Sequence, residues 1–190
     1  SCPRGTNPPP RPFYLLSDGA EVQELLEEIA GQPTVRTRVR STVPGTENAL
    51  FQAFSLKYQG KYGSPANVFG MAGSYDAAYL MAYSLASIGA GTTVDGTGMA
   101  NGMDKMVGGT PIDVGTGQIQ AAIGALGSGN AIDINGASGP LDFDLTQHEA
   151  PGDIEVWCVV LDGKGQPQFQ PSGRSYDSAT GQMAGTYKCP

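Results

Sequence analysis

The chain has 190 residues with a formal net charge of −7, and 15% of its residues are charged. This length allows one substantial hydrophobic core or two small lobes. The acidic balance argues against nucleic acid as a partner, because a nucleic-acid footprint needs clustered Lys and Arg. No apolar stretch is long enough to span a membrane, so membrane insertion is not expected.

The first part of the chain predicts strands alternating with helices. Residues 1–11 are a Pro-rich leading segment, and because the chain begins at Ser1 rather than Met, we expect a mature or truncated piece. PFYLLSDG predicts a buried strand closed by an Asp-Gly turn, and AEVQELLEEIAGQP predicts a helix stopped by Gly and Pro. TVRTRVRSTV alternates as a strand, with the arginines of RTRVR on its solvent face.

Helices dominate the middle of the chain. TENALFQAFSLKYQGKYG predicts a helix capped by Thr46, ended by Gly63, and burying Leu50, Phe51, Phe54 and Tyr58. GSYDAAYLMAYSLAS, residues 73–87, is apolar nearly all round and is expected to be the most buried helix, with Ser74 as its N-cap. Two glycine-interrupted helices follow, with Thr97 and Thr116 placed to cap them.

Strands return near the end. AIDI, GPLDFDL and DIEVWCVVLD are predicted strands, and the last is the strongest β signal in the chain. The remaining tail, residues 166–190, is polar and rich in turns, and its pattern predicts no regular element. Strand–helix pairs, then helices, then strands indicate an α/β fold with a central sheet flanked by helices.

Three cysteines are too few for a disulfide scaffold, and their spacing fits no metal site. Cys2 and Cys189 lie at opposite ends of the chain, where a bridge would tie down two loose tails and indicate an oxidising compartment. Both could equally be unpaired. Cys158, in VWCVV, is expected to be a small hydrophobic core residue.

The residues that catalysis needs are few. His148 is the single histidine and lies in a polar loop, where a general base beside Asp144 or Glu149 is the less favoured interpretation. No Gly-x-Ser-x-Gly elbow is present, and the glycine-rich segments do not follow the strand that a phosphate-binding loop requires. We expect neither an enzyme nor a bound cofactor or metal.

Two short motifs could face a ligand instead. Ser17 and Asp18 end the first predicted strand, where open α/β sheets bind ligands. The alternative is that the Asp-Gly pair only forms the turn and contacts no ligand. Ser74 and Tyr75 open the helix at 73–87, and Tyr75 offers both an aromatic face and a hydroxyl. Asp76 follows in the first turn, where its charge favours the helix dipole.

The order of LLSDG, FQAFSLKYQGKYG, SYDAAYLMAYSLASIGA and GPLDFDL resembles the C-terminal half of type I periplasmic binding proteins, the Leu/Ile/Val receptors of ABC importers. The resemblance covers residues 12–165 and leaves 166–190 as a tail. It implies a lobed α/β protein that closes on a small ligand without catalysis, with the family's N-terminal half absent from this chain.

The resemblance also implies a site and partners. Asp18 falls where the family places an acid, more often Glu, for the ligand's α-ammonium, and Tyr75 falls where it places a cleft tyrosine. Ser17 and Ser74, their neighbours, complete the expected set of ligand-binding residues. The implied ligand is an amino acid or similar small polar molecule, and the implied protein partner is the membrane permease of an ABC importer.

The implied location is periplasmic or extracellular, with any membrane anchor lying outside these residues. The alternative is a receptor or scaffold domain of the same fold that binds a protein partner. The tail motivates this alternative, because transport receptors usually end soon after their last strand.

Overall fold

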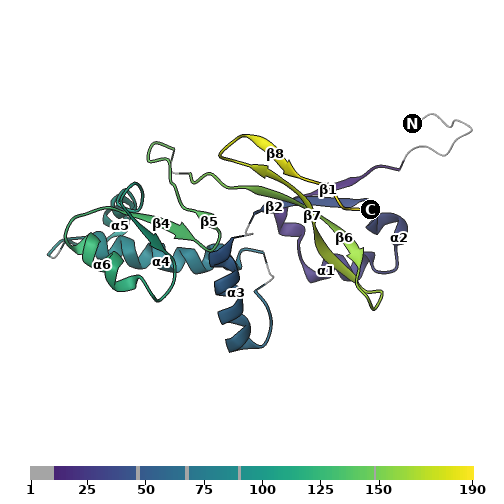
Figure 1. Ribbon diagram of the computed structural model, residues 1–190, viewed down its shortest axis with the longest axis horizontal. Coiled ribbons are helices and arrows are strands. Elements are labelled where there is room, and N and C mark those ends of the chain that lie inside the picture. Colours follow the sequence, from purple (N-terminus) through teal and green to yellow (C-terminus); the bar gives the residue numbers. More distant parts are fainter. Residues whose placement is uncertain (1–10, 46–47, 67–68, 90, 148) are drawn as a thin grey trace, which may run out of the picture. The chain divides into compact units, whose positions relative to one another are not determined.

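The structure, a computed structural model, describes residues 11–45, 48–66, 69–89, 91–147 and 149–190. It has an α/β fold with one five-stranded and one three-stranded sheet and accompanying helices, as the sequence predicts (Figure 1). The chain forms two compact units. Unit 1 comprises the described residues of Ser1–Val43, Glu155–Ser175 and Met183–Pro190, and unit 2 comprises those of Pro44–Ile154 and Tyr176–Gln182. Each has a hydrophobic core of its own.

Unit 1 is built around the five-stranded sheet, whose order is β1-β2-β6-β7-β8. These strands are β1 (Tyr14–Leu16), β2 (Val39–Pro44), β6 (Ile154–Leu161), β7 (Pro167–Asp177) and β8 (Gln182–Gly185). β1 runs parallel to β2, with Leu16 opposite Ser41. A short 3-10 turn (Asp18–Ala20) and helices α1 (Gln23–Ile29) and α2 (Pro33–Arg36) connect them. The core joins α1, β2 and β6 through Leu26, Ile29, Val39, Trp157 and Val159.

The tail contains structure that the sequence pattern did not predict. β7 and β8 complete the sheet, and in Figure 1 they form its yellow-green and yellow strands. Phe169 of β7 lies edge-on to Trp157 of β6, with ring centroids 4.9 Å apart. Much of this strand pair is exposed, and its polar side chains therefore hide the alternation that usually identifies a strand.

The expected Cys2–Cys189 bridge is wrong, because the structure joins Cys189 to Cys158. Cys158 is fully buried in β6, the middle strand of the sheet, so its environment is the expected core but its thiol is not free. Cys2 lies outside the described residues. The bridge attaches the end of the chain, rather than its beginning, to the sheet.

The predicted strand at 34–43 begins late. Pro33 opens α2, where proline's fixed φ suits the first helical turn, and the strand starts only at Val39. Arg40, predicted to lie on the solvent face of the strand, is instead buried and only 5% exposed. Its guanidinium donates hydrogen bonds to the carbonyls of Val39 and Pro190 and to the hydroxyl of Tyr187, which fix the end of the chain.

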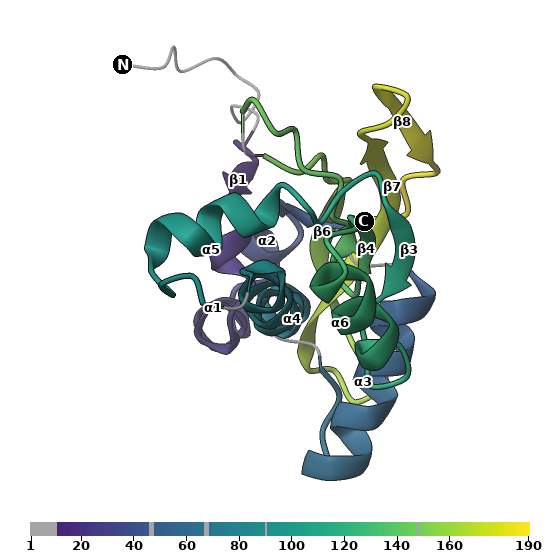
Figure 2. The same cartoon turned by 90° about the vertical axis from the view of Figure 1, so that its left-hand side faces the viewer.

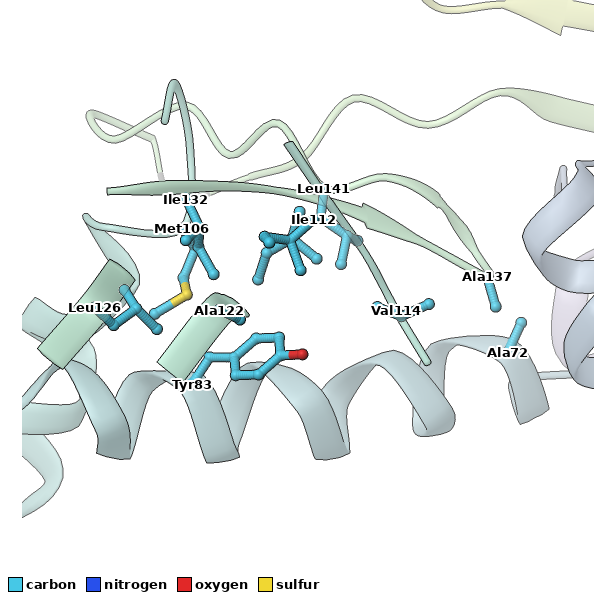
Figure 3. Close-up of a cluster of buried hydrophobic side chains, with 11 residues drawn as sticks. Ala72, Tyr83, Met106, Ile112, Val114, Ala122, Leu126, Ile132, Ala137 and Leu141 are labelled. Carbon is cyan, nitrogen blue, oxygen red and sulfur yellow. The ribbon is translucent and has the colours of Figure 1, made fainter. Parts of the chain in front are cut away.

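Unit 2 packs a three-stranded sheet and two helices onto one long helix. The sheet contains β3 (Thr110–Asp113), β4 (Ile132–Gly136) and β5 (Gly139–Pro140), with β3 parallel and β5 antiparallel to β4. The helices are α3 (Ala49–Tyr62), α4 (Met71–Ser87), α5 (Gly96–Met103) and α6 (Ile119–Gly127). Figure 2 looks nearly along α4, against which α5 and α6 pack. Side chains from the sheet, α4 and α6 fill the core between them (Figure 3).

Several helix ends differ from prediction. Asn48, which accepts a hydrogen bond from the Phe51 N–H, caps α3, whereas the expected cap Thr46 lies outside the described residues. Gly63 ends α3 as predicted, with φ 78°. Asp95, rather than Thr97, caps α5. α6 begins only at Ile119, so Thr116 does not cap it.

α4 also departs from expectation at its start and on one face. It begins at Met71 after Gly70, so Ser74 lies within the helix and is not its N-cap. Met81 and Leu85 are 58% and 47% exposed, so the helix is not buried all round. The predicted strand GPLDFDL is regular only at Gly139–Pro140, while β3 was not predicted at all.

Candidate functional site

A cavity of about 540 Å³ lies between α3 and the beginning of α4 in unit 2. α3 contributes Phe54, Lys57, Tyr58, Lys61 and Tyr62. The connecting segment and α4 contribute Phe69, Gly70, Met71, Ser74 and Tyr75. Gly70 has φ 81°, a left-handed conformation that turns the chain into α4 and that a residue with a Cβ adopts only with strain. The volume is typical of small-molecule sites, which span about 300–1,000 Å³.

Aromatic rings form most of the cavity wall. The spacing of Phe54, Tyr58 and Tyr62 places them on one face of α3 at successive turns. Phe54 stacks on Tyr75 across the two helices, with ring centroids 4.5 Å apart and an interplanar angle of 26°. Tyr58 and Tyr62 lie 4.5 Å apart, centroid to centroid. The wall can therefore receive a flat apolar group through its ring faces and edges.

The charge of the cavity is positive. Lys57 and Lys61, one turn apart on α3, are its charged lining residues among those that the structure describes, and no Asp or Glu of that part of the chain lines it. The Lys61 ammonium lies 5.3 Å from the centroid of the Tyr62 ring. Neither lysine forms an ion pair among the residues that the structure describes. Their ammonium groups are therefore available to an anion from outside the chain.

The Tyr75 hydroxyl is a neutral hydrogen-bonding group. It lies 3.2 Å from the Tyr79 hydroxyl, one turn further along α4. Burial, reinforced by this hydrogen bond, raises the pKa of the Tyr75 phenol above its usual value. Tyr75 consequently keeps its proton at physiological pH and can orient a ligand, but it cannot act as a base there.

Ser17 and Asp18 lie in unit 1, directly after β1. The Ser41 hydroxyl of β2, which is buried, donates to the carbonyl oxygens of Leu16 at 2.6 Å and Ser17 at 2.9 Å and fixes this strand end. The Asp18 carboxylate accepts from the Gly19 N–H at 2.9 Å, as an Asp-Gly turn does. Asp18 is half-buried, so the carboxylate remains open to further donors.

The expected site residues thus fall on two different units. Ser17 and Asp18 belong to unit 1, whereas Ser74 and Tyr75 belong to unit 2 and both line its cavity. The role of Ser74 and Tyr75 as ligand contacts stays a prediction, as does that of Ser17 and Asp18.

Asp76 has a different role from the expected one. It is not in the first turn of α4 but within the helix, 1% exposed, and it faces the turn between β4 and β5. There its carboxylate accepts hydrogen bonds from the N–H groups of Ala137 at 2.8 Å and Ser138 at 2.7 Å. This buried link sets the position of the helical turn that carries Tyr75.

The sequence interpretation missed the lysines. It assigned Phe54 and Tyr58 to the core and gave Lys57 and Lys61 no role. The segment FQAFSLKYQGKY has aromatics at 54, 58 and 62 and lysines at 57 and 61, so both sets recur at four-residue spacing. That repeated pairing could have indicated an aromatic, cationic helix face.

A second hollow in unit 2, of about 740 Å³, is acidic. Asp133, Asp142, Asp144 and Glu149 are among its lining residues. Among the described residues, no group of three or more His, Cys, Asp or Glu side chains could hold a metal ion. The described helices also include none that is long and apolar enough to cross a membrane. His148 lies outside the described residues.

Comparisons with known proteins place the fold. No family model matches the sequence, and a search of curated proteins finds no match. The structure is similar to the crystal structure of a leucine-binding protein, LivK, from Thermotoga maritima MSB8, with a TM-score of 0.52 and 20% sequence identity. The match covers 83% of this chain and 36% of that one. The chain therefore has an α/β fold like that of type I periplasmic binding proteins and spans about a third of the length of that relative.

Proposed function

We propose that this chain is part of an extracytoplasmic solute-binding protein that takes an amino acid or similar small polar ligand for import by an ABC transporter. The observation that carries the proposal is the structural similarity to a leucine-binding protein over 83% of the chain. The protein binds and releases its ligand without catalysis, and a membrane permease is its protein partner. It acts in the periplasm or outside the cell.

Each unit has its own proposed ligand contacts. On unit 1, the Asp18 carboxylate accepts hydrogen bonds from a ligand ammonium, and Ser17 adds a hydroxyl beside it. On unit 2, Tyr75 offers its ring and its neutral hydroxyl, and Ser74 adds a second hydroxyl at the cavity. A charge-assisted hydrogen bond to Asp18 is the strongest of these contacts.

The alternative, a scaffold domain that binds a protein partner, loses its motivation. It rested on a tail without structure, whereas residues 167–185 supply β7 and β8 of the unit 1 sheet. Removing the tail would therefore remove two strands and one half of the disulfide rather than a free binding segment.

Isothermal titration with a panel of amino acids tests the proposal, using the longest chain that the gene encodes around these residues. Asp18→Asn should weaken binding about ten- to a hundredfold, because it removes the charge from a hydrogen bond worth about 1.5–3 kcal/mol. Tyr75→Phe should weaken binding about two- to tenfold, since it removes one neutral hydrogen bond.

Asp104→Asn is the matched control, because Asp104 is an exposed carboxylate at the end of α5. It should leave the affinity unchanged. Binding of no amino acid would exclude this ligand class, and full affinity in Asp18→Asn would show that Asp18 only makes the turn.

A further inference from the structure

The cavity between α3 and α4 offers lysine ammonium groups and aromatic rings, which suit an aromatic anion better than they suit the ammonium group of an amino acid. All its lining residues lie between Phe54 and Tyr75, so it is complete within unit 2. Among the described lining residues, a ligand ammonium would find two lysines and no carboxylate. A ligand carboxylate would instead find two cations and the Ser74 hydroxyl.

We propose that this cavity binds an aromatic carboxylate, with its ring against Phe54, Tyr58 and Tyr75 and its carboxylate between Lys57 and Lys61. The proposal deepens the proposed function and rests on it in one respect, namely that Ser74 and Tyr75 contact the ligand. For the unit 2 cavity it replaces the amino acid with an acid that has a flat aromatic ring and a single carboxylate.

The ring position follows from the stacking geometry. The Phe54 and Tyr75 rings stack at 4.5 Å and both line the cavity, so a ligand ring in the cavity would contact both of them. Tyr58 continues the row, 6.0 Å from Phe54 between ring centroids. An aliphatic chain would fill the same space but would gain less from the ring faces and edges.

The carboxylate position follows from the lysines. Lys57 and Lys61 are neighbours on one helix face, so their like charges repel each other in the empty cavity. A carboxylate between them removes that repulsion and gains two charge-assisted hydrogen bonds. The Lys61 ammonium already lies against the Tyr62 ring, 5.3 Å from its centroid, and so is held beside the aromatic wall.

Isothermal titration with phenylacetate tests the proposal, with 2-phenylethanol as an uncharged probe that has the same ring and a similar size. Phenylacetate should bind at least fivefold more tightly than 2-phenylethanol. Lys57→Met and Lys61→Met, which keep an apolar stem, should each weaken phenylacetate binding about two- to fivefold, as expected for exposed charge pairs. Raising the salt concentration should weaken it further.

Two more variants control for structure. Lys164→Met removes an exposed lysine from the turn between β6 and β7 in unit 1 and should leave phenylacetate binding unchanged. Phe54→Leu keeps an apolar side chain but removes the stacked ring, and it should weaken phenylacetate and 2-phenylethanol alike. Circular dichroism and thermal melts of every variant confirm that the chain is folded.

The outcomes separate this proposal from the amino-acid proposal. Phenylacetate binding that depends on the lysines but not on Asp18 supports the aromatic carboxylate, and the amino-acid proposal fails only if, in addition, no amino acid binds. Amino-acid binding that depends on Asp18, without phenylacetate binding, overturns the aromatic carboxylate and retains the proposed function. Equal affinities for phenylacetate and 2-phenylethanol, or lysine variants that bind as the parent does, also overturn it.

Discussion

Asp76 and Ser138, 62 residues apart in the chain, are joined by two hydrogen bonds to one carboxylate oxygen, from the Ser138 N–H at 2.7 Å and its hydroxyl at 2.6 Å. The other carboxylate oxygen accepts from the Ala137 N–H at 2.8 Å. Asp76 is 1% exposed, so these donors replace the water that a carboxylate otherwise requires. The second turn of α4 and the turn between β4 and β5 are therefore fixed to each other.

Asp76→Asn should lower the free energy of unfolding by about 2–3 kcal/mol, because an amide oxygen can serve only one side of this arrangement and its NH₂ group then faces an N–H donor. Urea denaturation followed by circular dichroism measures the change. Asp95→Asn is the matched control, since Asp95 caps α5 through one hydrogen bond and asparagine caps helices about equally well. Equal stability of the two variants would show that the Asp76 hydrogen bonds add little.

Gly136→Ala should disturb the same link sterically. A Cβ on Gly136 would lie 2.9 Å from both Cγ of Asp76 and the carbonyl oxygen of Gly139, closer than packed atoms tolerate. We expect a loss of about 1–3 kcal/mol in unfolding free energy, as for overpacked sites.

Gly124→Ala should raise the unfolding free energy, whereas Gly136→Ala lowers it, and it serves as the control for Gly136→Ala. A Cβ on Gly124 in α6 would meet no atom within 4 Å, and alanine favours the helix by about 0.5–1 kcal/mol. Stabilisation by both substitutions would show that the turn can move away from α4.

Sequence periodicity was sufficient for the elements with a strong local pattern. The helices at Gln23–Ile29, Ala49–Tyr62 and Met71–Ser87, and the strand at Ile154–Leu161, form where their apolar spacing predicts. Their ends were less predictable, because several residues of the right type compete to cap each helix. Asp95 and Thr97 are two residues apart, and only the folded chain shows which one accepts the hydrogen bond.

Features that depend on distant contacts were not predictable. The sequence pattern predicts that Asp76 favours the helix dipole. Its hydrogen-bond partners at 137 and 138 belong to a turn whose position depends on the whole of unit 2, so they could not be predicted. The tail was read as irregular, because β7 and β8 are defined by pairing with a sheet rather than by their own pattern. Ser74 and Tyr75 line the cavity, although their role as ligand contacts stays a prediction, and the sequence interpretation overlooked the lysines that give the cavity its charge.

Reduction of the Cys158–Cys189 bridge should destabilise unit 1. The bridge closes a loop of 31 residues, for which chain entropy predicts about 3–4 kcal/mol of stabilisation. Cys189→Ala should therefore lower the denaturation midpoint under oxidising conditions and make it insensitive to dithiothreitol. Mass spectrometry of an unreduced digest should show the peptides of Cys158 and Cys189 linked, and a peptide of Cys2 linked to Cys189 would contradict the structure.

Stability should fall in alkaline solution. Burial raises the pKa of both Tyr75 and Tyr83 above the usual value of 10.0. The unfolded chain therefore loses these protons at lower pH than the folded chain does. The stabilisation that comes from keeping the two phenols protonated in the folded chain is complete below about pH 10. It is lost as the pH rises through the pKa values of the folded chain. Urea midpoints measured from pH 8 to about pH 11 should fall less in a Tyr75→Phe, Tyr83→Phe double variant than in the parent chain.

Tyr83→Phe should stabilise unit 2, although it removes a polar group. The Tyr83 side chain is 1% exposed, and its hydroxyl has no hydrogen-bond partner among the described residues. Figure 3 shows its ring in the core with apolar side chains such as Ile112 and Ala122. An unpaired buried hydroxyl costs about 1–3 kcal/mol, so its removal should raise the unfolding free energy by about 1 kcal/mol.

Tyr79→Phe is the matched control for Tyr83→Phe, one turn away on the same helix. The Tyr79 hydroxyl lies 3.2 Å from that of Tyr75, so its removal breaks a hydrogen bond and should lower the unfolding free energy by about 0.5–1.5 kcal/mol. Urea denaturation of the two variants should therefore give changes of opposite sign. A loss of stability in Tyr83→Phe would instead mean that a buried water satisfies its hydroxyl, because water inside a core is retained where polar groups need it.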